Sequence, residues 1–208
     1  MAETKSICKI KLFLLGNSGV GKTCLVQKYV NNIFKADHIS TIGMDSISKE
    51  TILPNGEKVL IDFIDTAGQE RYRSISYNLV RNAEGIILMY DITNIKSFES
   101  IIEWVDSIRK IKPNDFPILL VGNKCDLEEE RLIETEEGRQ EAEKYGFLFL
   151  ETSIKNGINV DDAVSTLALK VFEQKSKEEK ESKNKNKNKK DNIHLQNVQI
   201  ERRRGCNC

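Results

Sequence analysis

The chain has 208 residues, of which 31% are charged and 39% are hydrophobic, a balance typical of soluble proteins. This length accommodates one domain with a full hydrophobic core and an appendage. No apolar run approaches the roughly 18 residues that a membrane-spanning helix needs. A helical integral membrane protein is therefore excluded.

Charge is distributed unevenly along the chain, although 32 basic and 32 acidic side chains balance overall. Residues 175–208 carry 11 Lys or Arg against 5 Asp or Glu, which leaves 21 against 27 in residues 1–174. A basic tail on an acidic body suits an anionic membrane surface, whereas a nucleic-acid-binding protein concentrates basic charge on its folded part. We therefore expect no nucleic-acid partner.

Five cysteines are scattered along the chain, at Cys8, Cys24, Cys125, Cys206 and Cys208. The first residues, MAETKSICKIKLFLL, lack the long apolar region and the cleavage site of a secretory signal peptide. We therefore expect a reducing compartment and no disulfide framework.

Short apolar runs alternate with helical patterns in the first 174 residues. Strands are predicted at 9–15, 58–65, 85–92, 117–123 and 146–152, and helices at 22–33, 96–111, 135–145 and 159–173. The sequence Pro-Asn-Gly at 54–56 predicts a hairpin turn between two extended stretches. This alternation predicts an α/β fold of the Rossmann-like P-loop NTPase type, a mostly parallel six-stranded sheet flanked by helices, with one antiparallel edge strand.

The end of the chain differs in composition from the rest. Residues 175–208 repeat Lys, Asn and Glu without apolar periodicity. Such a segment buries too little apolar surface to offset the entropy lost on ordering. We expect a folded domain over 1–174 and a disordered tail over 175–208.

Residues 16–23 read GNSGVGKT and fit the phosphate-binding pattern G-x-x-x-x-G-K-[ST] between a predicted strand and a predicted helix. Glycines let backbone N–H groups turn toward phosphate oxygens, and the positive end of the helix faces the same anion. Lys22 is expected to reach the β- and γ-phosphates, and Thr23 to give its hydroxyl to Mg²⁺. The predicted nucleotide contacts of this segment are Asn17, Ser18, Gly19, Val20, Gly21, Lys22, Thr23 and Cys24.

Two tetrapeptides at predicted strand ends indicate that the base is guanine: NKCD at 123–126 and TSIK at 152–155. Asp126 can accept hydrogen bonds from the ring N–H and the exocyclic amine of guanine, a donor pair that adenine lacks. Asn123 is expected to bridge the base and the phosphate loop, and the Lys124 stem to lie on the ring. The second tetrapeptide supplies Ser153, the Ile154 N–H for the guanine carbonyl, and Lys155.

With these motifs, residues 8–172 resemble the Rab family within the Ras superfamily of small GTPases. The resemblance rests on GNSGVGKT, STIG (40–43), DTAGQE (65–70), NKCD and TSIK. It implies that Thr41 closes on Mg²⁺ and the γ-phosphate in the GTP state, so that the Mg²⁺ residues are Thr23, Thr41 and Asp65. It also implies that the Gly68 N–H contacts the γ-phosphate and that Gln69 orients the attacking water. Phe34 matches the aromatic residue that packs on the edge of guanine, with a core phenylalanine as the alternative.

The resemblance implies a GTP-binding and GTP-hydrolysing molecular switch that regulates vesicle-mediated membrane transport. Loops 35–46 and 66–82 would be ordered by the γ-phosphate and released on hydrolysis. Nothing in the motifs offers covalent catalysis, so unaided hydrolysis is expected at about 10⁻⁴ s⁻¹. The implied partners are GTP and GDP, an exchange factor, a GTPase-activating protein, a GDP-dissociation inhibitor or escort protein, and effectors.

The sequence departs from the family pattern at the aromatic positions that join the two switch loops, where it carries Ser46, Ile64, Leu79 and Val80. This loss removes stacking area from the expected effector surface. Two alternatives therefore stay open: a non-hydrolysing scaffold that holds GTP, and a Ras- or Rho-like signalling GTPase. Thr41 and Gln69 argue against the first, and the C-terminal Cys-x-Cys argues against the second.

The last residues read RRRGCNC and allow a metal site, a disulfide or a lipid anchor at Cys206 and Cys208. Two thiols are too few for a metal site, and a disulfide is short-lived in a reducing compartment. The resemblance implies that both cysteines carry geranylgeranyl groups, and two lipid chains hold a membrane stably where one does not. The protein is then expected on the cytoplasmic face of an intracellular membrane, cycling with the cytosol.

Overall fold

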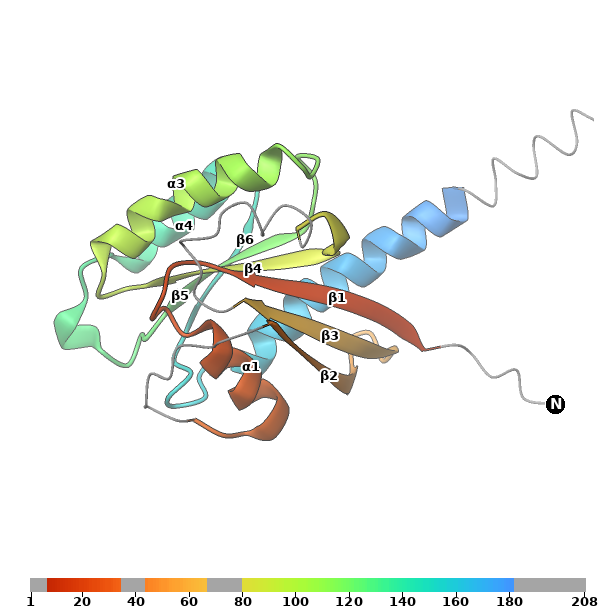
Figure 1. Ribbon diagram of the computed structural model, residues 1–208, viewed down its shortest axis with the longest axis horizontal. Coiled ribbons are helices and arrows are strands. Elements are labelled where there is room, and N and C mark those ends of the chain that lie inside the picture. Colours follow the sequence, from red (N-terminus) through yellow and green to blue (C-terminus); the bar gives the residue numbers. More distant parts are fainter. Residues whose placement is uncertain (1–6, 35–43, 67–79, 182–208) are drawn as a thin grey trace, which may run out of the picture. The chain divides into compact units, whose positions relative to one another are not determined.

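The computed structural model describes residues 7–34, 44–66 and 80–181 (Figure 1). The chain divides into two compact units, residues 1–171 and residues 172–208. The first unit holds the sheet, its covering helices and the candidate site. Of the second unit, residues 172–181 are described, and they are helical.

Six strands of the described residues form one sheet, in the order β2-β3-β1-β4-β5-β6. All neighbouring pairs are parallel except β2 with β3, which places a single antiparallel strand at the edge. The predicted fold class is confirmed. The strands are β1 (Cys8–Leu15), β2 (Met44–Ile52), β3 (Lys58–Thr66), β4 (Gly85–Asp91), β5 (Ile118–Asn123) and β6 (Leu148–Thr152).

The predicted hairpin joins β2 to β3. The Leu53 N–H donates to the Glu57 carbonyl over 2.9 Å, and the Gly56 N–H donates to the Leu53 carbonyl over 2.8 Å. Gly56 has a φ of 82°, a conformation that glycine adopts without steric cost. The turn chemistry of Pro54, Asn55 and Gly56 thus produces the antiparallel edge strand.

Helices cover both faces of the sheet: α1 lies on one face, and α3 and α4 lie on the other (Figure 1). Every residue of β4 and β5 is buried, as expected for parallel strands covered on both sides. The bounds are α1 (Lys22–Asn31), α3 (Ile95–Arg109) and α4 (Thr135–Tyr145), with a short 3₁₀ helix, η1 (Glu128–Glu130), before α4.

A last helical run covers residues 160–181. Within the first unit its buried positions are spaced as one helical face, at Val160, Ala163, Val164, Leu167, Ala168 and Val171. Residues 175–181, which the sequence predicted to be disordered, are helical. They read KSKEEKE, and such residues extend an existing helix readily because no new nucleus has to form.

The parallel strands bring the predicted motifs to one edge of the sheet. The phosphate loop follows β1, Asp91 ends β4, Asn123 ends β5, and Ser153 and Ile154 follow β6. In open α/β sheets, ligands bind beyond the carboxyl ends of the strands. The fold thus positions the site where the sequence analysis expects a nucleotide.

Candidate nucleotide-binding site

Two glycines of the phosphate loop, residues 16–21, lie where a side chain would overlap neighbouring atoms. Gly16 has a φ of 135°, and a Cβ there would overlap the Met89 carbonyl oxygen of β4. Gly21 has a φ of 106°, and a Cβ there would overlap the side-chain amide of Asn123. Both glycines therefore allow the loop to lie against the ends of neighbouring strands.

Lys22 begins α1 and folds back along this loop. Its side chain is almost fully enclosed, since the residue is 5% exposed. The Nζ atom donates to the carbonyl of Gly16 over 2.7 Å and to that of Asn17 over 2.8 Å. A buried cation, the positive end of a helix and a Gly-rich loop together form an anion-binding site.

Asn123 links the guanine side of the site to the phosphate loop. Its Nδ2 donates to the Val20 carbonyl over 2.8 Å, and the residue is 3% exposed. Its Oδ1 accepts from the Thr152 hydroxyl over 3.1 Å and from the Ile154 N–H over 3.4 Å. The Ile154 N–H, expected to face the guanine carbonyl, thus donates to Asn123 in this structure.

Asp126 is held by two polar residues of the other tetrapeptide, Ser153 and Lys155. The Ser153 hydroxyl donates to Asp126 Oδ1 over 2.6 Å, and Lys155 Nζ lies 3.9 Å from Asp126 Oδ2. The Asp126 side chain is 9% exposed, whereas that of Lys155 is 62% exposed. The structure therefore places the carboxylate in a fixed, nearly buried position beside Ser153.

Lys124 forms an ion pair that sequence reasoning missed. Its Nζ lies 2.5 Å from Asp91 Oδ2, and its backbone has a φ of 70°, which non-glycine residues rarely adopt. Asp91 is fixed in turn, because its Oδ1 accepts from the Thr93 N–H over 2.9 Å and from the Thr93 hydroxyl over 2.8 Å. The sequence signal that could have indicated this ion pair is Asp91, an aspartate at the end of an apolar run and two residues before Thr93.

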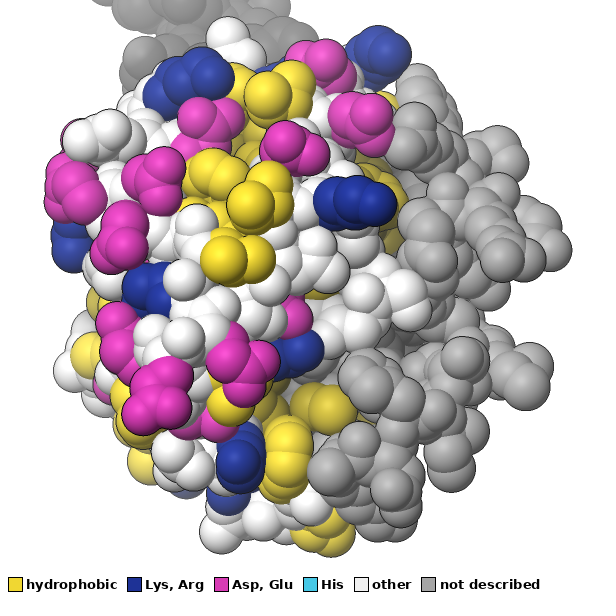
Figure 2. All heavy atoms as spheres, turned by 90° about the vertical axis from the view of Figure 1, so that its left-hand side faces the viewer, with side chains coloured by type: hydrophobic (Ala, Val, Ile, Leu, Met, Phe, Trp, Pro, Cys, Tyr) yellow, Lys and Arg dark blue, Asp and Glu magenta, His cyan; other side chains and the backbone are white. Residues whose placement is uncertain are grey.

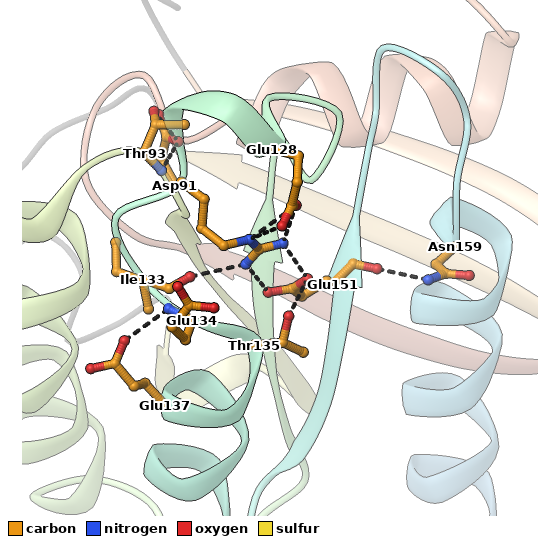
Figure 3. A network of polar contacts seen from close by, with 10 residues as sticks. Asp91, Thr93, Glu128, Ile133, Glu134, Thr135, Glu137, Glu151 and Asn159 are labelled. Atoms are coloured by element: carbon orange, nitrogen blue, oxygen red, sulfur yellow. Dashed lines mark hydrogen bonds and ion pairs between the residues drawn. The ribbon is translucent and has the colours of Figure 1, made fainter.

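Sequence reasoning also missed a network around Arg131, which lies between η1 and α4 in the chain. Figure 3 shows Glu128, Thr135 and Glu151 of this network close together. Arg131 Nη1 and Nη2 donate to the two carboxylate oxygens of Glu151 over 2.8 Å and 3.0 Å. Its Nε donates to Glu128 over 2.9 Å, and Nη1 also donates to the Ile133 carbonyl over 2.9 Å. Thr135 adds a hydrogen bond of 3.1 Å to Glu151.

The Arg131 network connects the two guanine-side segments. Glu128 follows Asp126 by two residues, and Glu151 directly precedes the TSIK segment. The Arg131 side chain is only 7% exposed. The hydrogen bonds that Arg131 donates to Glu151, and then those to Glu128, raise the pKa of Arg131, so the guanidinium stays charged. One buried cation therefore holds both segments.

The structure describes only some of the remaining predicted site residues. Thr41, Gly68, Gln69, Cys206 and Cys208 lie outside the described residues, as does most of the two switch loops. Phe34 follows α1 and is 38% exposed, so it is not a core residue.

Two of the expected Mg²⁺ residues, Thr23 and Asp65, lie in the described part of the chain. Thr23 is the second residue of α1, directly after Lys22. In the register of β1 with β3, Phe13 pairs with Ile64, so the backbone of Asp65 reaches the same edge as the phosphate loop. Hydroxyl and carboxylate oxygens are the hard ligands that Mg²⁺ prefers. No cluster of three or more His, Cys, Asp or Glu in the described ranges could hold a metal.

Comparison with known proteins identifies the family. The chain matches the Ras family over residues 11–173. It is 38% identical over 198 residues to Ras-related protein Rab-3A of Homo sapiens, which covers 95% of this chain and 90% of the relative. It is 44% identical over 168 residues to Ras-related protein Rab-8 of Diplobatis ommata, covering 81% of this chain and 80% of the relative.

This chain is a Rab-family small GTPase. As a Rab GTPase it binds GTP, hydrolyses it to GDP and phosphate, and acts as a switch in vesicle trafficking. Ras-superfamily GTPases generally use Mg²⁺. Across residues 7–34, 44–66 and 80–181, none of the helices is both long and apolar enough to span a bilayer.

Two of the positions where this Rab GTPase lacks the family's usual aromatic residues are built into the domain interior. Val80 is buried in the same core cluster as Ala83 and Ile86, and Ile64 is partly buried against that cluster. The side chains of Ser46 and Leu79 are outside the described part of the chain. The aliphatic replacements at 64 and 80 thus contribute to core packing.

Proposed function

We propose that this Rab GTPase is a lipid-anchored switch on the cytoplasmic face of an intracellular membrane, with its nucleotide held at the carboxyl edge of the sheet. The observation that supports the placement of the nucleotide is the meeting of three groups there. Lys22 is buried against its own loop, Asn123 joins that loop to the TSIK segment, and Asp126 is fixed by Ser153.

In this proposal the guanine base is read by Asp126, whose carboxylate accepts from the ring N–H and the exocyclic amine. Ser153 and Lys155 orient that carboxylate, and Asn123 fixes the distance between the base pocket and the phosphate loop. Lys124, placed by Asp91, lies along the ring, and Phe34 packs at its edge. Adenine lacks this donor pair, so the nearly buried carboxylate would keep only its contacts with Ser153 and Lys155, and the lost hydrogen bonds cost about 1–3 kcal/mol.

Hydrolysis in this proposal depends on positioning and charge neutralisation. The loop N–H groups from Asn17 to Cys24 and the Lys22 amine bind the β- and γ-phosphates, and Gly68 contacts the γ-phosphate. Thr23, Thr41 and Asp65 would hold Mg²⁺, which neutralises charge that develops on the phosphate oxygens. Gln69 orients a water molecule whose oxygen attacks the γ-phosphorus while the bond to the GDP oxygen breaks. A GTPase-activating protein is needed because the unaided rate is about 10⁻⁴ s⁻¹.

The proposed anchor is a pair of thioethers at Cys206 and Cys208, each formed when the thiol sulfur displaces diphosphate from a geranylgeranyl donor. Residues 1–174 carry 27 acidic against 21 basic side chains, so attraction to anionic lipid falls to the basic tail. Figure 2 shows acidic side chains interspersed with Lys and Arg over one face of the domain. Arg202, Arg203 and Arg204 would add about 1 kcal/mol each near such a surface. An escort or GDP-dissociation inhibitor would shield the lipids in the cytosol, and an exchange factor and effectors would act at the membrane.

The nucleotide that the purified protein carries tests whether the chain is a switch or a GTP-holding scaffold. We expect GDP when the protein is denatured and its nucleotide is separated by anion-exchange chromatography. Replacing Gln69→Leu, which removes the amide that orients water, should shift the bound nucleotide toward GTP. GTP on the unmodified protein would support the scaffold instead.

Serine at both Cys206 and Cys208 tests the anchor. We expect the double variant to move from the membrane fraction of cells to the soluble fraction, while Cys8→Ser leaves the distribution unchanged. A double variant that stays on membranes would refute lipid anchoring at these thiols.

A further inference from the structure

Asn17, the second residue of the phosphate loop, is tied to helix α3 by its side chain. Asn17 Nδ2 donates to Ser100 Oγ over 2.9 Å, and Trp104 Nε1 donates to Asn17 Oδ1 over 3.2 Å. Both contacts are partly buried, and Trp104 packs against the hydrophobic core. The phosphate loop therefore has a side-chain connection to an element that no nucleotide motif includes.

The donors and acceptors of this connection permit a single arrangement. The indole N–H of Trp104 can only donate, so the carbonyl oxygen of the Asn17 amide must face it. The amide nitrogen must then face Ser100. The Ser100 hydroxyl can accept from it because its own hydrogen is donated to the Lys96 carbonyl over 2.7 Å. The order of three hydrogen bonds thus fixes the orientation of the Asn17 amide.

The backbone of the same residue contacts the phosphate-binding lysine. The Asn17 carbonyl accepts from Lys22 Nζ over 2.8 Å. A displacement of Asn17 would therefore move a carbonyl oxygen that positions the Lys22 amine. The side chain of Asn17 connects to α3, and its carbonyl connects to the cation of the anion site.

Helix α3 is itself held firmly enough to act as a support. Asn94 caps its first turn by accepting from the Ser97 N–H over 3.3 Å, and the buried Ser97 hydroxyl accepts from the Asp91 N–H over 3.0 Å. Ile101, Val105 and Ile108 are buried along the helix. Since Asp91 also positions Lys124, the first turns of α3 support both the phosphate loop and the guanine side.

We propose that Asn17, Ser100 and Trp104 form a clamp, here called the α3 clamp, which holds the phosphate loop in its nucleotide-binding conformation and so lengthens the residence time of GDP and GTP. Ser100 and Trp104 are positioning residues, because they act through Asn17. The proposal rests on GTP binding, which family membership establishes, and is independent of the lipid anchor.

The rate of GDP release tests the α3 clamp. The protein is loaded with tritiated GDP, excess unlabelled GDP is added, and the label retained on filters is followed with time. Ser100→Ala leaves the amide nitrogen of Asn17 without its acceptor, and Trp104→Phe removes the indole donor while keeping an aromatic ring. We expect each to release GDP about two- to tenfold faster, the factor that corresponds to one hydrogen bond lost.

Two matched variants control for general effects on α3. Ser107→Ala removes a hydroxyl from the same helix, where it donates to the Glu103 carbonyl over 2.8 Å, and should leave the rate unchanged. Ser100→Thr retains the hydroxyl and should release GDP at the rate of the unmodified protein. Equal acceleration by Ser107→Ala and Ser100→Ala would overturn the clamp.

Asn17→Ala separates a positioning role from a structural one. Since the clamp acts through Asn17, Trp104→Phe and Ser100→Ala should add no further acceleration in the Asn17→Ala background. Full additivity there would overturn the proposal, and so would an unchanged release rate in both single variants. Failure of the unmodified protein to retain labelled GDP would instead contradict nucleotide binding itself.

Discussion

Asp126 shows how one residue can determine which base this Rab GTPase accepts. Its carboxylate is nearly buried and already receives a hydrogen bond of 2.6 Å from Ser153. A carboxylate so placed cannot turn away from a mismatched base, and the oxygens that it presents only accept hydrogen bonds. Base selectivity should therefore follow the donor and acceptor character of this side chain.

We predict that Asp126→Asn changes the base preference from guanine to xanthine. An amide presents a donor where the carboxylate presented an acceptor, so guanine loses a hydrogen bond, whereas xanthine offers a carbonyl in place of the exocyclic amine. GTP affinity should fall by about 10- to 100-fold, since hydrogen bonds to charged groups contribute about 1.5–3 kcal/mol. Competition between GTP and xanthosine triphosphate measures this.

Glu129→Gln, which removes a nearby exposed charge in η1, is the control and should leave both affinities unchanged. An unchanged preference for guanine in Asp126→Asn would show that another group reads the base.

At the scale of elements, β5 and α4 are packed around the Tyr90 hydroxyl of β4. A Cβ added at Gly138 of α4 would overlap that hydroxyl and would lie 2.8 Å from the Phe149 ring. A Cβ at Gly122 of β5 would lie 2.7 Å from the same hydroxyl. The hydroxyl has no hydrogen-bond partner among the described residues, and burial raises the pKa of Tyr90. The glycines thus allow the three elements to approach closely.

We predict that Gly138→Ala lowers the free energy of unfolding by about 1–3 kcal/mol, the usual effect of overpacking. This reverses the gain of about 0.5–1 kcal/mol that alanine normally gives over glycine within a helix. Tyr90→Phe should be neutral or stabilising, because it removes a buried polar atom without a partner, and it should partly rescue Gly138→Ala. Thermal unfolding at a fixed GDP concentration provides the comparison, and a stabilised Gly138→Ala would contradict this packing.

The Arg131 network makes a second prediction for elements, since it joins η1, α4 and β6. Arg131→Met leaves the Glu151 carboxylate, whose side chain is 13% exposed, without its cation, and breaking a buried pair from one side costs about 3–5 kcal/mol. We expect a clearly lower melting temperature and faster GDP release, because the NKCD and TSIK segments lose their common support. Both are measured on GDP-loaded protein.

Arg139→Met is the matched control for Arg131→Met. Arg139 lies on α4 and forms an exposed pair with Glu136 over 3.5 Å. Exposed pairs contribute only about 0–1 kcal/mol, so this variant should change neither quantity appreciably. Equal effects of the two variants would contradict a special role for the buried pair.

For the molecule as a whole, bound nucleotide should stabilise the folded domain. The site is assembled from the loops after β1, β5 and β6, and Asn123 is the residue that spans all three. A ligand that binds only the folded state stabilises it by about 2.7 kcal/mol at 100 times its dissociation constant. We predict that removing nucleotide with EDTA and phosphatase lowers the melting temperature, and that GDP with Mg²⁺ restores it while ADP does not. Equal restoration by ADP would contradict guanine selectivity.

The sequence predicted the fold and the motif positions well because both depend on local patterns. Strand and helix periodicity, the turn at 54–56 and the strand-end motifs lie within short windows, and parallel pairing then brings the motifs together. The connections that support the site are not local. Arg131 and Glu151 are 20 residues apart, and Asn17 and Trp104 are 87 apart. No spacing rule connects such pairs, so only the folded chain reveals them.

Trp104 is the sole tryptophan of the chain, and its indole N–H is bonded to the phosphate loop. Indole fluorescence depends on the polarity and hydrogen bonding around the ring. The unlabelled protein therefore carries an intrinsic optical probe beside its own phosphate loop. Loading and release of nucleotide could be followed in real time from tryptophan emission, with no modified nucleotide or attached dye.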